Sequence, residues 1–460
     1  MLQHSIHHIE IGVRENGEEF VLELCKKLGL YRAGYRETVH SRQWLVRAND
    51  WVQLLVTEIR SSPPEQEQQN CAHSDQQRDE AIANDPYLVL WDQDVDEGGR
   101  PVRNSVFNVC LTVKDIQRQV ERLERCGAKM EKPVTVLSDA DGEVKVAMVR
   151  SCLGNVVHTL VERQHYSGFF LPGFTSIRRQ DVKTDDGYDE IRPPTPPRNR
   201  ITHVDHVTFA VEVDTSQDII AWYENAFGMK RFYVNSCLIC HCSAEDDGEG
   251  FVINLPNMAL RLKAFEYWKC AETGVSSNTT LHHHSNGDVG VNDDDDDGCN
   301  KLLFVIAESL KDSEPNQVDT FLKDHKGPGI QHVALHTGNI VDTVSRLKQQ
   351  GLQFVDPPHT YYKEINGMLK DLNMKESVSR LEDLGILVDV EYGNDKTHGD
   401  KKAKYLLQKF TKPIFEVNTF FFEIIQRMGA TGFGANNIIA LWRSLQALLQ
   451  TEQQQQQHDV

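Results

Sequence analysis

A single carboxylate, Glu423, lies within a strongly apolar stretch near the C-terminus, Thr419-Phe-Phe-Phe-Glu-Ile-Ile-Gln-Arg427. The β-prone residues around it predict a buried strand. A buried carboxylate needs a compensating charge, because burying it alone costs several kcal/mol or forces it neutral. Taken by itself, this stretch favours a structural ion pair with an Arg or Lys, and a bound metal ion is the alternative.

The chain also contains an internal repeat, which predicts two copies of one module. The stretch around His206 matches the opening stretch around His8, and each reads as a strand followed by a helix. The strand that contains His332 matches the strand that contains Asn108, and a predicted helix again follows each of them. Equivalent positions in the two halves can therefore be compared directly.

The C-terminal strand completes the comparison, because setting Arg427 on Arg163 places Glu423 opposite Thr159. The second copy thus carries two histidines and a carboxylate where the first copy carries His8, Asn108 and Thr159. Two imidazoles and one carboxylate form the facial triad of non-haem Fe(II) oxygenases, which leaves positions for substrate and dioxygen. One such histidine alone would be read as a hydrogen-bonded core residue. Three ligand-type residues at equivalent places of a repeat predict a metal site in the second copy. The first copy would then be a structural vestige.

The domain organisation follows from the repeat and from polar interruptions. We expect an N-terminal domain, a linker, a C-terminal catalytic domain and a disordered tail at 1–165, 166–200, 201–450 and 451–460. Polar inserts at 61–84 and 276–300 interrupt the two domains, and their composition predicts disorder. The glycine-rich stretch at 432–437 lacks the spacing of a phosphate loop and is better interpreted as a flap. The amphipathic helix at 438–450 would then pack on the barrel or close a lid.

Two further motifs resemble ligand sets. His282, His283 and His284 lie in the acidic insert, where a flexible solvated loop is the better interpretation because it cannot hold a fixed geometry. Cys237-Leu-Ile-Cys240-His241 has the spelling of a haem c attachment site. Haem c requires an exported, oxidising setting, and in a strand the two cysteines would face opposite sides, which also disfavours a shared zinc.

Composition limits the partners and the cellular compartment that the sequence suggests. The formal charge of −19 argues against a nucleic-acid partner, and no apolar stretch is long enough to predict an integral membrane segment. Ten cysteines without a secretory signal fit a reducing, intracellular compartment. The first residues show no Arg-rich presequence, which weakens a mitochondrial location without deciding against it.

Several ordered motifs resemble the 4-hydroxyphenylpyruvate dioxygenase family of the vicinal-oxygen-chelate superfamily. They are Gly327-Pro-Gly-Ile-Gln-His332, Tyr405-Leu-Leu-Gln408-Lys-Phe410, Phe421-Phe-Glu423 and Gly432-Phe-Gly-Ala-Asn-Asn437. The stretches Phe169–Phe174 and Ala307–Leu310 resemble more closely the animal dioxygenase-like paralogue. The resemblance covers nearly all of the chain except the inserts and the tail. It implies an α+β fold of paired βαβββ modules that form two open barrels, with a C-terminal lid helix.

The resemblance also implies roles for individual residues. His206, His332 and Glu423 would hold Fe(II), and an aromatic 2-oxo acid would chelate the iron before dioxygen reacts. The substrate pocket would be lined by glutamines that orient the substrate, by phenylalanines around its ring and by a lid residue pair, namely Gln317, Gln331, Gln408, Phe410, Phe421, Phe433, Asn437 and Ile438. Relatives commonly form homodimers. The resemblance to the dioxygenase-like paralogue suggests a mitochondrial location, whereas the resemblance to 4-hydroxyphenylpyruvate dioxygenase, an enzyme of tyrosine breakdown, suggests the cytoplasm.

Three positions depart from the pattern of the dioxygenases. Leu262 replaces a pocket serine, Ala307 replaces an asparagine, and Ile438 replaces a phenylalanine. Hydroxymandelate synthases resemble this chain in carrying a smaller aliphatic residue at the third position. In both kinds of enzyme the 2-oxo acid loses its carboxyl group, and an oxygen atom then enters either the ring, giving homogentisate, or the benzylic carbon, giving 4-hydroxymandelate.

Loss of the flat wall at Ile438 favours hydroxymandelate as the product. Homogentisate formation in tyrosine metabolism is the alternative within the same chemistry. A catalytically weak paralogue with a binding or regulatory role is the alternative from another class, which the replacements at Leu262 and Ala307 keep open.

Overall fold

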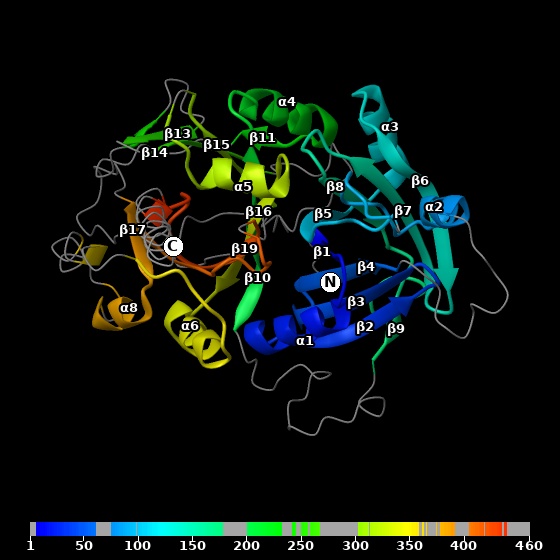
Figure 1. The fold of residues 1–460 in the computed structure, drawn as a ribbon, viewed down its shortest axis with the longest axis horizontal. Helices are drawn as coiled ribbons and strands as arrows, with labels where there is room; N and C mark the ends of the chain where they lie inside the picture. Colours follow the sequence, from blue (N-terminus) through cyan, green and yellow to red (C-terminus); the bar gives the residue numbers. More distant parts are fainter. Residues whose placement is uncertain are drawn as a thin grey trace, which may run out of the picture.

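The computed structural model of the 460-residue chain describes the following residues: 6–60, 75–97, 99–177, 200–231, 242–244, 250–255, 258–266, 302–311, 313–357, 361–362, 365, 374, 378–391, 404–417, 419–434 and 437–438. Within them, two curled sheets lie side by side, with helices on their outer faces (Figure 1).

The first sheet has the strand order β6-β7-β8-β5-β1-β4-β3-β2-β9. Its strands are β1 (Ile6–Val13), β2 (Tyr31–Glu37), β3 (Ser41–Asn49), β4 (Val52–Ile59), β5 (Ser105–Thr112), β6 (Met130–Asp139), β7 (Gly142–Arg150), β8 (Val157–Glu162) and β9 (Thr175–Ser176). The accompanying helices are α1 (Gly17–Leu28), α2 (Asp75–Asn84) and α3 (Ile116–Arg125).

The second sheet has the order β12-β13-β14-β15-β10-β16-β19-β18-β17, and β11 pairs with β14. Its strands are β10 (Ile201–Val211), β11 (Lys230–Arg231), β12 (Cys242–Ala244), β13 (Gly250–Leu255), β14 (Met258–Glu266), β15 (Leu303–Ser309), β16 (Gly329–Thr337), β17 (Leu387–Glu391), β18 (Lys404–Phe410) and β19 (Phe421–Met428). The helices are α4 (Ser216–Phe227), α5 (Gln317–His325), α6 (Ile340–Gln349) and α8 (Val378–Leu384).

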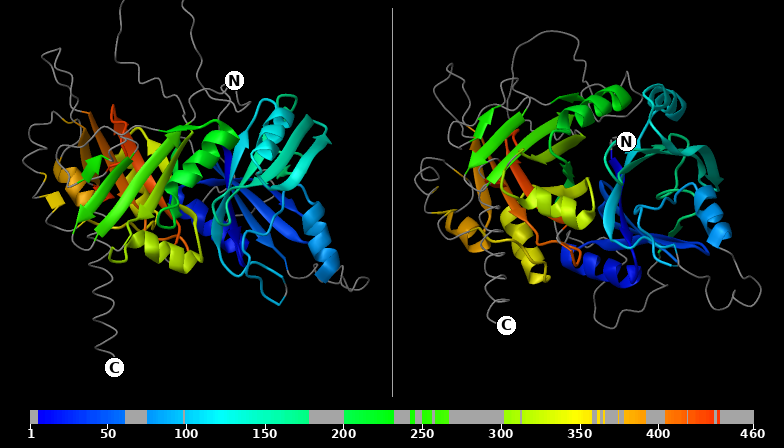
Figure 2. Two further views of the ribbon diagram at one scale, coloured as in Figure 1. Left: turned by 90° about the horizontal axis from the view of Figure 1, so that it is seen from above. Right: turned by 45° about the horizontal axis from the view of Figure 1, so that its top comes forward.

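Each sheet is built from two copies of one unit, in which a strand leads to a helix and the last strand returns parallel to the first. Thus β4 runs parallel to β1, β8 to β5, β15 to β10 and β19 to β16. The two units of a sheet are joined by the antiparallel pairs β1–β5 and β10–β16. This topology confirms the predicted α+β fold of paired βαβββ modules, and each sheet curls into an open barrel (Figure 2).

Alternation along the central strands separates the pocket from the core. On β10, Val207 and Phe209 belong to a large apolar cluster that also includes Ile9 and Val109 of the first module. His206 and Thr208 face the other side, because successive side chains of a strand point to opposite faces. The two modules therefore share one continuous core, and the inner face of the second sheet remains for a polar site.

The predicted insert at 61–84 is partly wrong, because residues 75–84 form α2 and the side chain of Ile82 is buried in an apolar cluster. The rest of this helix is mostly polar, so the sequence pattern carries little signal. The predicted linker at 166–200 also begins too early. β9 pairs with β2, and Phe170 is buried against the first sheet.

The remaining predictions about polar segments lie outside the described residues. They concern the insert at 276–300, the Cys237-to-His241 motif, the helix beyond residue 438 and the tail at 451–460. None of the described helices is long and apolar enough to cross a membrane.

Candidate metal centre and substrate pocket

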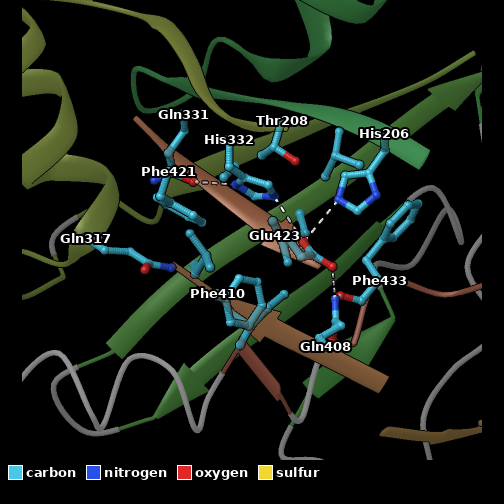
Figure 3. Close-up of a pocket in the computed structure, with 15 residues that line it drawn as sticks. His206, Thr208, Gln317, Gln331, His332, Gln408, Phe410, Phe421, Glu423 and Phe433 are labelled. Atoms are coloured by element: carbon cyan, nitrogen blue, oxygen red, sulfur yellow. Dashed lines mark hydrogen bonds and ion pairs between the residues drawn. The ribbon is translucent and has the colours of Figure 1, made fainter. Parts of the chain in front are cut away.

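Three neighbouring strands bring His206, His332 and Glu423 together. The residues lie on β10, β16 and β19, which are adjacent in the second sheet. Glu423 Oε2 is 3.4 Å from His206 Nε2 and 3.5 Å from His332 Nε2, and one ligand atom from each residue lies within 4.8 Å of the others. Ligands on adjacent corners of an octahedron lie about 3 Å apart, so the donor set fits a divalent cation. Figure 3 shows the three side chains converging on one point.

Irregular pairing of β10 with β16 orients the imidazoles of His206 and His332. The register shifts between Val204 and His206, which leaves Asp205 as an extra residue, and again between Thr208 and Phe209, opposite Gln331. Such bulges turn a side chain that would otherwise face away. Each histidine consequently has its preceding residue beside it.

Asp205 connects His206 to a cation outside the pocket. Its carboxylate accepts from Arg427 through Nε and Nη2, each at 2.8 Å, and contacts His206 Nδ1 at 2.7 Å. Because a carboxylate only accepts, the proton of a neutral His206 lies on Nδ1 and leaves the Nε2 lone pair facing the centre. A carboxylate that holds a histidine in this way is typical of metal sites.

The second imidazole is held differently. His332 Nδ1 is 3.3 Å from Gln331 Oε1, and the ring stacks on Phe421 with centroids 4.8 Å apart. An amide oxygen also accepts, so His332 too presents Nε2 to Glu423. Both histidines are thus oriented as ligands by contacts on their far side.

The carboxylate is fixed by an amide chain. Gln408 Nε2 donates to Glu423 Oε1 at 2.8 Å, and Asn437 Nδ2 donates to Gln408 Oε1 at 2.7 Å. The Tyr361 hydroxyl lies 3.0 Å from Asn437 Oδ1. Gly434 has φ 73°, and a Cβ there would collide with the Gln408 amide, so the glycine lets the loop close over this chain.

The electrostatics of the centre favour a positive charge. Burial by itself would raise the pKa of Glu423, but His206 and then His332 lower it to about 2. Burial lowers the pKa of His206, and Glu423 and Asp205 outweigh it, so the pKa rises to about 9. For His332, burial dominates over Glu423 and the pKa falls. Within the described residues no Lys or Arg pairs with Glu423, which removes the ordinary ion pair as its compensation.

The pocket has a polar floor and an apolar wall. Besides the three converging residues it is lined by amides and a hydroxyl, by aromatic rings and by aliphatic side chains, namely Gln317, Gln331, Gln408, Thr208, Phe410, Phe421, Phe433, Leu260, Leu262, Val305, Ala307 and Ile438. The three positions that depart from the dioxygenase pattern, Leu262, Ala307 and Ile438, pack with Phe433 in one apolar cluster. Leu262 and Ala307 are also register partners on β14 and β15.

Seven of the eight predicted pocket residues line this cavity, and Asn437 does not. Its side chain is fully buried and hydrogen-bonded to Gln408, which lines the pocket, and to Tyr361. Asp205, Thr208 and Tyr361 were not predicted from the sequence. Asp205 could have been found from its place before His206, whereas Tyr361 carries no signal in the sequence.

Comparison with known proteins gives the class of this fold. The profile of the Glyoxalase/Bleomycin resistance protein/Dioxygenase superfamily matches residues 200–372. A solved triple mutant of 4-hydroxymandelate synthase from Streptomyces coelicolor has a TM-score of 0.62 at 21% identity and covers 97% of this chain and 98% of its own. These matches agree with the paired modules described above.

Curated relatives place the chain more narrowly. The 4-hydroxyphenylpyruvate dioxygenase-like protein of Rattus norvegicus is 34% identical over 346 residues, which are 74% of this chain and 77% of the relative. The Homo sapiens protein of the same name is 32% identical over 350 residues, 74% of this chain and 77% of the relative. The 4-hydroxyphenylpyruvate dioxygenase of Dictyostelium discoideum is 29% identical over 350 residues, 76% and 78% of the two chains. The chain belongs to the 4-hydroxyphenylpyruvate dioxygenase family.

Proposed function

We propose that the protein is an Fe(II)-dependent dioxygenase that converts 4-hydroxyphenylpyruvate to 4-hydroxymandelate. The observation that carries the proposal is the convergence of two oriented imidazoles and a buried carboxylate at one end of a pocket whose other wall contains Ile438. His206, His332 and Glu423 would hold the iron. Bound there, iron would be chelated by the 2-oxo acid and would activate dioxygen.

The charge of the pocket suits an anionic substrate. No Lys or Arg is among the described residues that line it. A divalent ion with Glu423 leaves one positive charge, which the single carboxylate of a 2-oxo acid neutralises. Without the ion, a buried anion here would be poorly compensated.

The walls suit an aromatic ring. Phe410 and Phe433 lie on the pocket together with Phe421, whose ring meets that of Phe410 nearly edge to face. Gln317 Oε1 is buried without a hydrogen-bond partner among the described residues, and it can accept from a phenol hydroxyl. The ligand therefore needs an apolar middle and a polar far end.

The choice of product depends on Ile438. A flat aromatic side chain at this position would hold the substrate ring in one orientation, whereas an aliphatic side chain lets the ring turn aside and present the benzylic carbon. Ile438 packs against the cluster that contains Leu262 and Ala307, so its neighbours on this side of the pocket are aliphatic apart from Phe433.

The test is anaerobic loading with Fe(II), then addition of 4-hydroxyphenylpyruvate and air. Both products are isomers, formed with one CO₂ from the same substrate and O₂, so they must be separated by chromatography against standards. We expect hydroxymandelate from the parent and from Ile438→Leu, and a shift toward homogentisate in Ile438→Phe. Formation of homogentisate by the parent would instead assign the protein to tyrosine breakdown. Absence of oxygen uptake with iron bound would favour a binding role.

Location in mitochondria and pairing into homodimers stay predictions from the resemblance.

A further inference from the structure

The Thr208 hydroxyl is a polar group in the pocket that has no partner among the described residues. Its side chain is 1% exposed, and Oγ1 makes no hydrogen bond to any of them. An unpaired buried hydroxyl destabilises a protein, because it has lost its hydrogen bonds to water without replacing them, so such groups in native structures call for an explanation.

Thr208 lies beside the candidate metal centre. It follows His206 by two residues on β10, which places both on the same face of the sheet, and it is the register partner of His332 on β16. Figure 3 draws Thr208 between the two histidines. Its partner on the other side is Val305 of β15, which cannot hydrogen-bond through its side chain.

The first module explains why the hydroxyl is left unpaired. By strand register, the position of Thr208 corresponds to Glu10, which pairs with Asn108 as Thr208 pairs with His332. Glu10 accepts from Thr57, Gln43 and Asn108. The positions that correspond to Thr57 and Gln43 in the second sheet are Ala307 and Leu262, which form the same kind of cross-strand pair (β14–β15 matching β3–β4). The groups that would serve Thr208 have been replaced by apolar ones.

We propose that Thr208 Oγ donates a hydrogen bond to a carboxylate oxygen of the ligand that binds at the metal centre. This inference rests on the proposed function. A hydroxyl donates well to a carboxylate, and such charge-assisted bonds are stronger than neutral ones. With no Lys or Arg among the described lining residues, the anionic end of a 2-oxo acid has only the metal and neutral donors to bind it. Thr208 is therefore a positioning residue for the carboxylate.

The test compares Thr208→Val, which keeps the shape and removes the hydroxyl, with Thr208→Ser, which keeps the hydroxyl. Iron content and the melting temperature of the metal-free protein are measured first. Binding of 4-hydroxyphenylpyruvate and of oxalate to the anaerobic Fe(II) protein is then measured by calorimetry. Oxalate offers carboxylate oxygens to the metal without an aromatic ring, so it probes Thr208 independently of the true substrate.

We expect Thr208→Val to bind both probes about ten-fold more weakly, with iron content and melting temperature not lowered, and Thr208→Ser to bind as the parent does. Equal affinity of the parent and Thr208→Val for both probes would overturn the inference and leave the proposed function intact. A parent that binds oxalate but not 4-hydroxyphenylpyruvate, with weaker oxalate binding in Thr208→Val, would overturn the proposed substrate alone. Lower iron content or melting temperature in Thr208→Val would show a structural role, and a parent that binds neither probe would overturn both proposals.

Discussion

The two modules repeat one backbone and differ in what their equivalent positions do. In both, a bulge precedes the first histidine, and an arginine at the end of the module contacts the bulged residue. In the second module Arg427 binds Asp205, which binds His206. In the first, Arg163 lies 3.1 Å from His7, whose Nδ1 is 2.8 Å from His8 Nδ1.

This difference decides which histidine pair suits a metal. His7, His8 and Cys110 are also close enough to hold an ion. Arg163 can only donate, so His7 Nε2 accepts and the proton of a neutral His7 lies on Nδ1, where it is shared with His8. Burial, His8 and Arg163 lower the pKa of His7, which keeps it neutral. His7 has no lone pair left for a metal, whereas His206 and His332 each keep one.

The interiors of the two modules also differ in whether their polar side chains hydrogen-bond to one another. In the first module Glu10, Thr57, Gln43 and Asn108 are joined by hydrogen bonds, and the network continues through Asn108 to Thr159 and through Gln43 to Arg36. In the second, the corresponding wall is apolar, and the polar groups that remain face a pocket. A module can therefore use the same strands to complete its own hydrogen bonds or to leave them for a ligand.

The largest predicted effect comes from removing one imidazole in the second module. His332→Ala should abolish stoichiometric Fe(II) binding and turnover, because the two remaining ligands, His206 and Glu423, cannot hold the ion. The matched change Asn108→Ala in the first module should leave iron content and activity of the folded protein nearly unchanged. Metal analysis and oxygen uptake check both, and turnover retained in His332→Ala would remove the assignment of the metal site.

The next effect tests the group behind His206. Asp205→Asn should weaken Fe(II) binding about 10–100-fold, because the carboxylate orients the imidazole and increases its basicity. It also leaves the Arg427 charge partly unpaired and should lower stability. His7→Asn, the equivalent change in the first module, should not alter iron affinity. Equal losses of iron in the two variants would contradict the distinction between the modules.

Glu10 predicts a pH effect on stability that belongs to the first module. Burial outweighs the hydrogen bonds to Thr57, Asn108 and Gln43 and raises the pKa of Glu10 from 4.5 to about 7. The folded state therefore binds the proton more tightly, so stability from this group is full below pH 4.5 and is lost as pH rises toward 7. A shift of this size is worth about 3 kcal/mol. Denaturant unfolding at about pH 5 and about pH 8 should show a smaller difference in Glu10→Gln than in the parent, and an unchanged difference would place the titrating group elsewhere.

The smallest predicted effect concerns the series of hydrogen bonds that holds Glu423 through Gln408 and Asn437. Tyr361→Phe removes the hydroxyl that contacts Asn437 and accepts from the Val388 amide at 2.8 Å. We expect a loss of about 1 kcal/mol in the free energy of unfolding and a modest fall in kcat, because Gln408 is held less firmly. Iron content should stay unchanged. Thermal unfolding and steady-state kinetics measure the two effects, and an unaltered kcat would limit Tyr361 to a structural role.

Much of the site could be predicted because its residues follow a repeat. The matching strands around His8 and His206 align three ligand-type residues along the chain, and the alternation of apolar residues defines the strands. The aromatic residues of the pocket are recognisable from motifs, because each lies on a strand or loop whose local sequence is distinctive.

The amino-acid sequence by itself determined the strands, the duplication, the family and the identity of the three converging residues, because these depend on local pattern and on order along the chain. Tertiary structure alone decided that Asp205 and His206 face the same side, that Tyr361 supports Asn437, and that Leu262, Ala307 and Ile438 form one wall. It also decided that Thr208 has no partner among the described residues. These features depend on strand register, bulges and contacts between residues far apart in the chain, which periodicity within one segment does not encode.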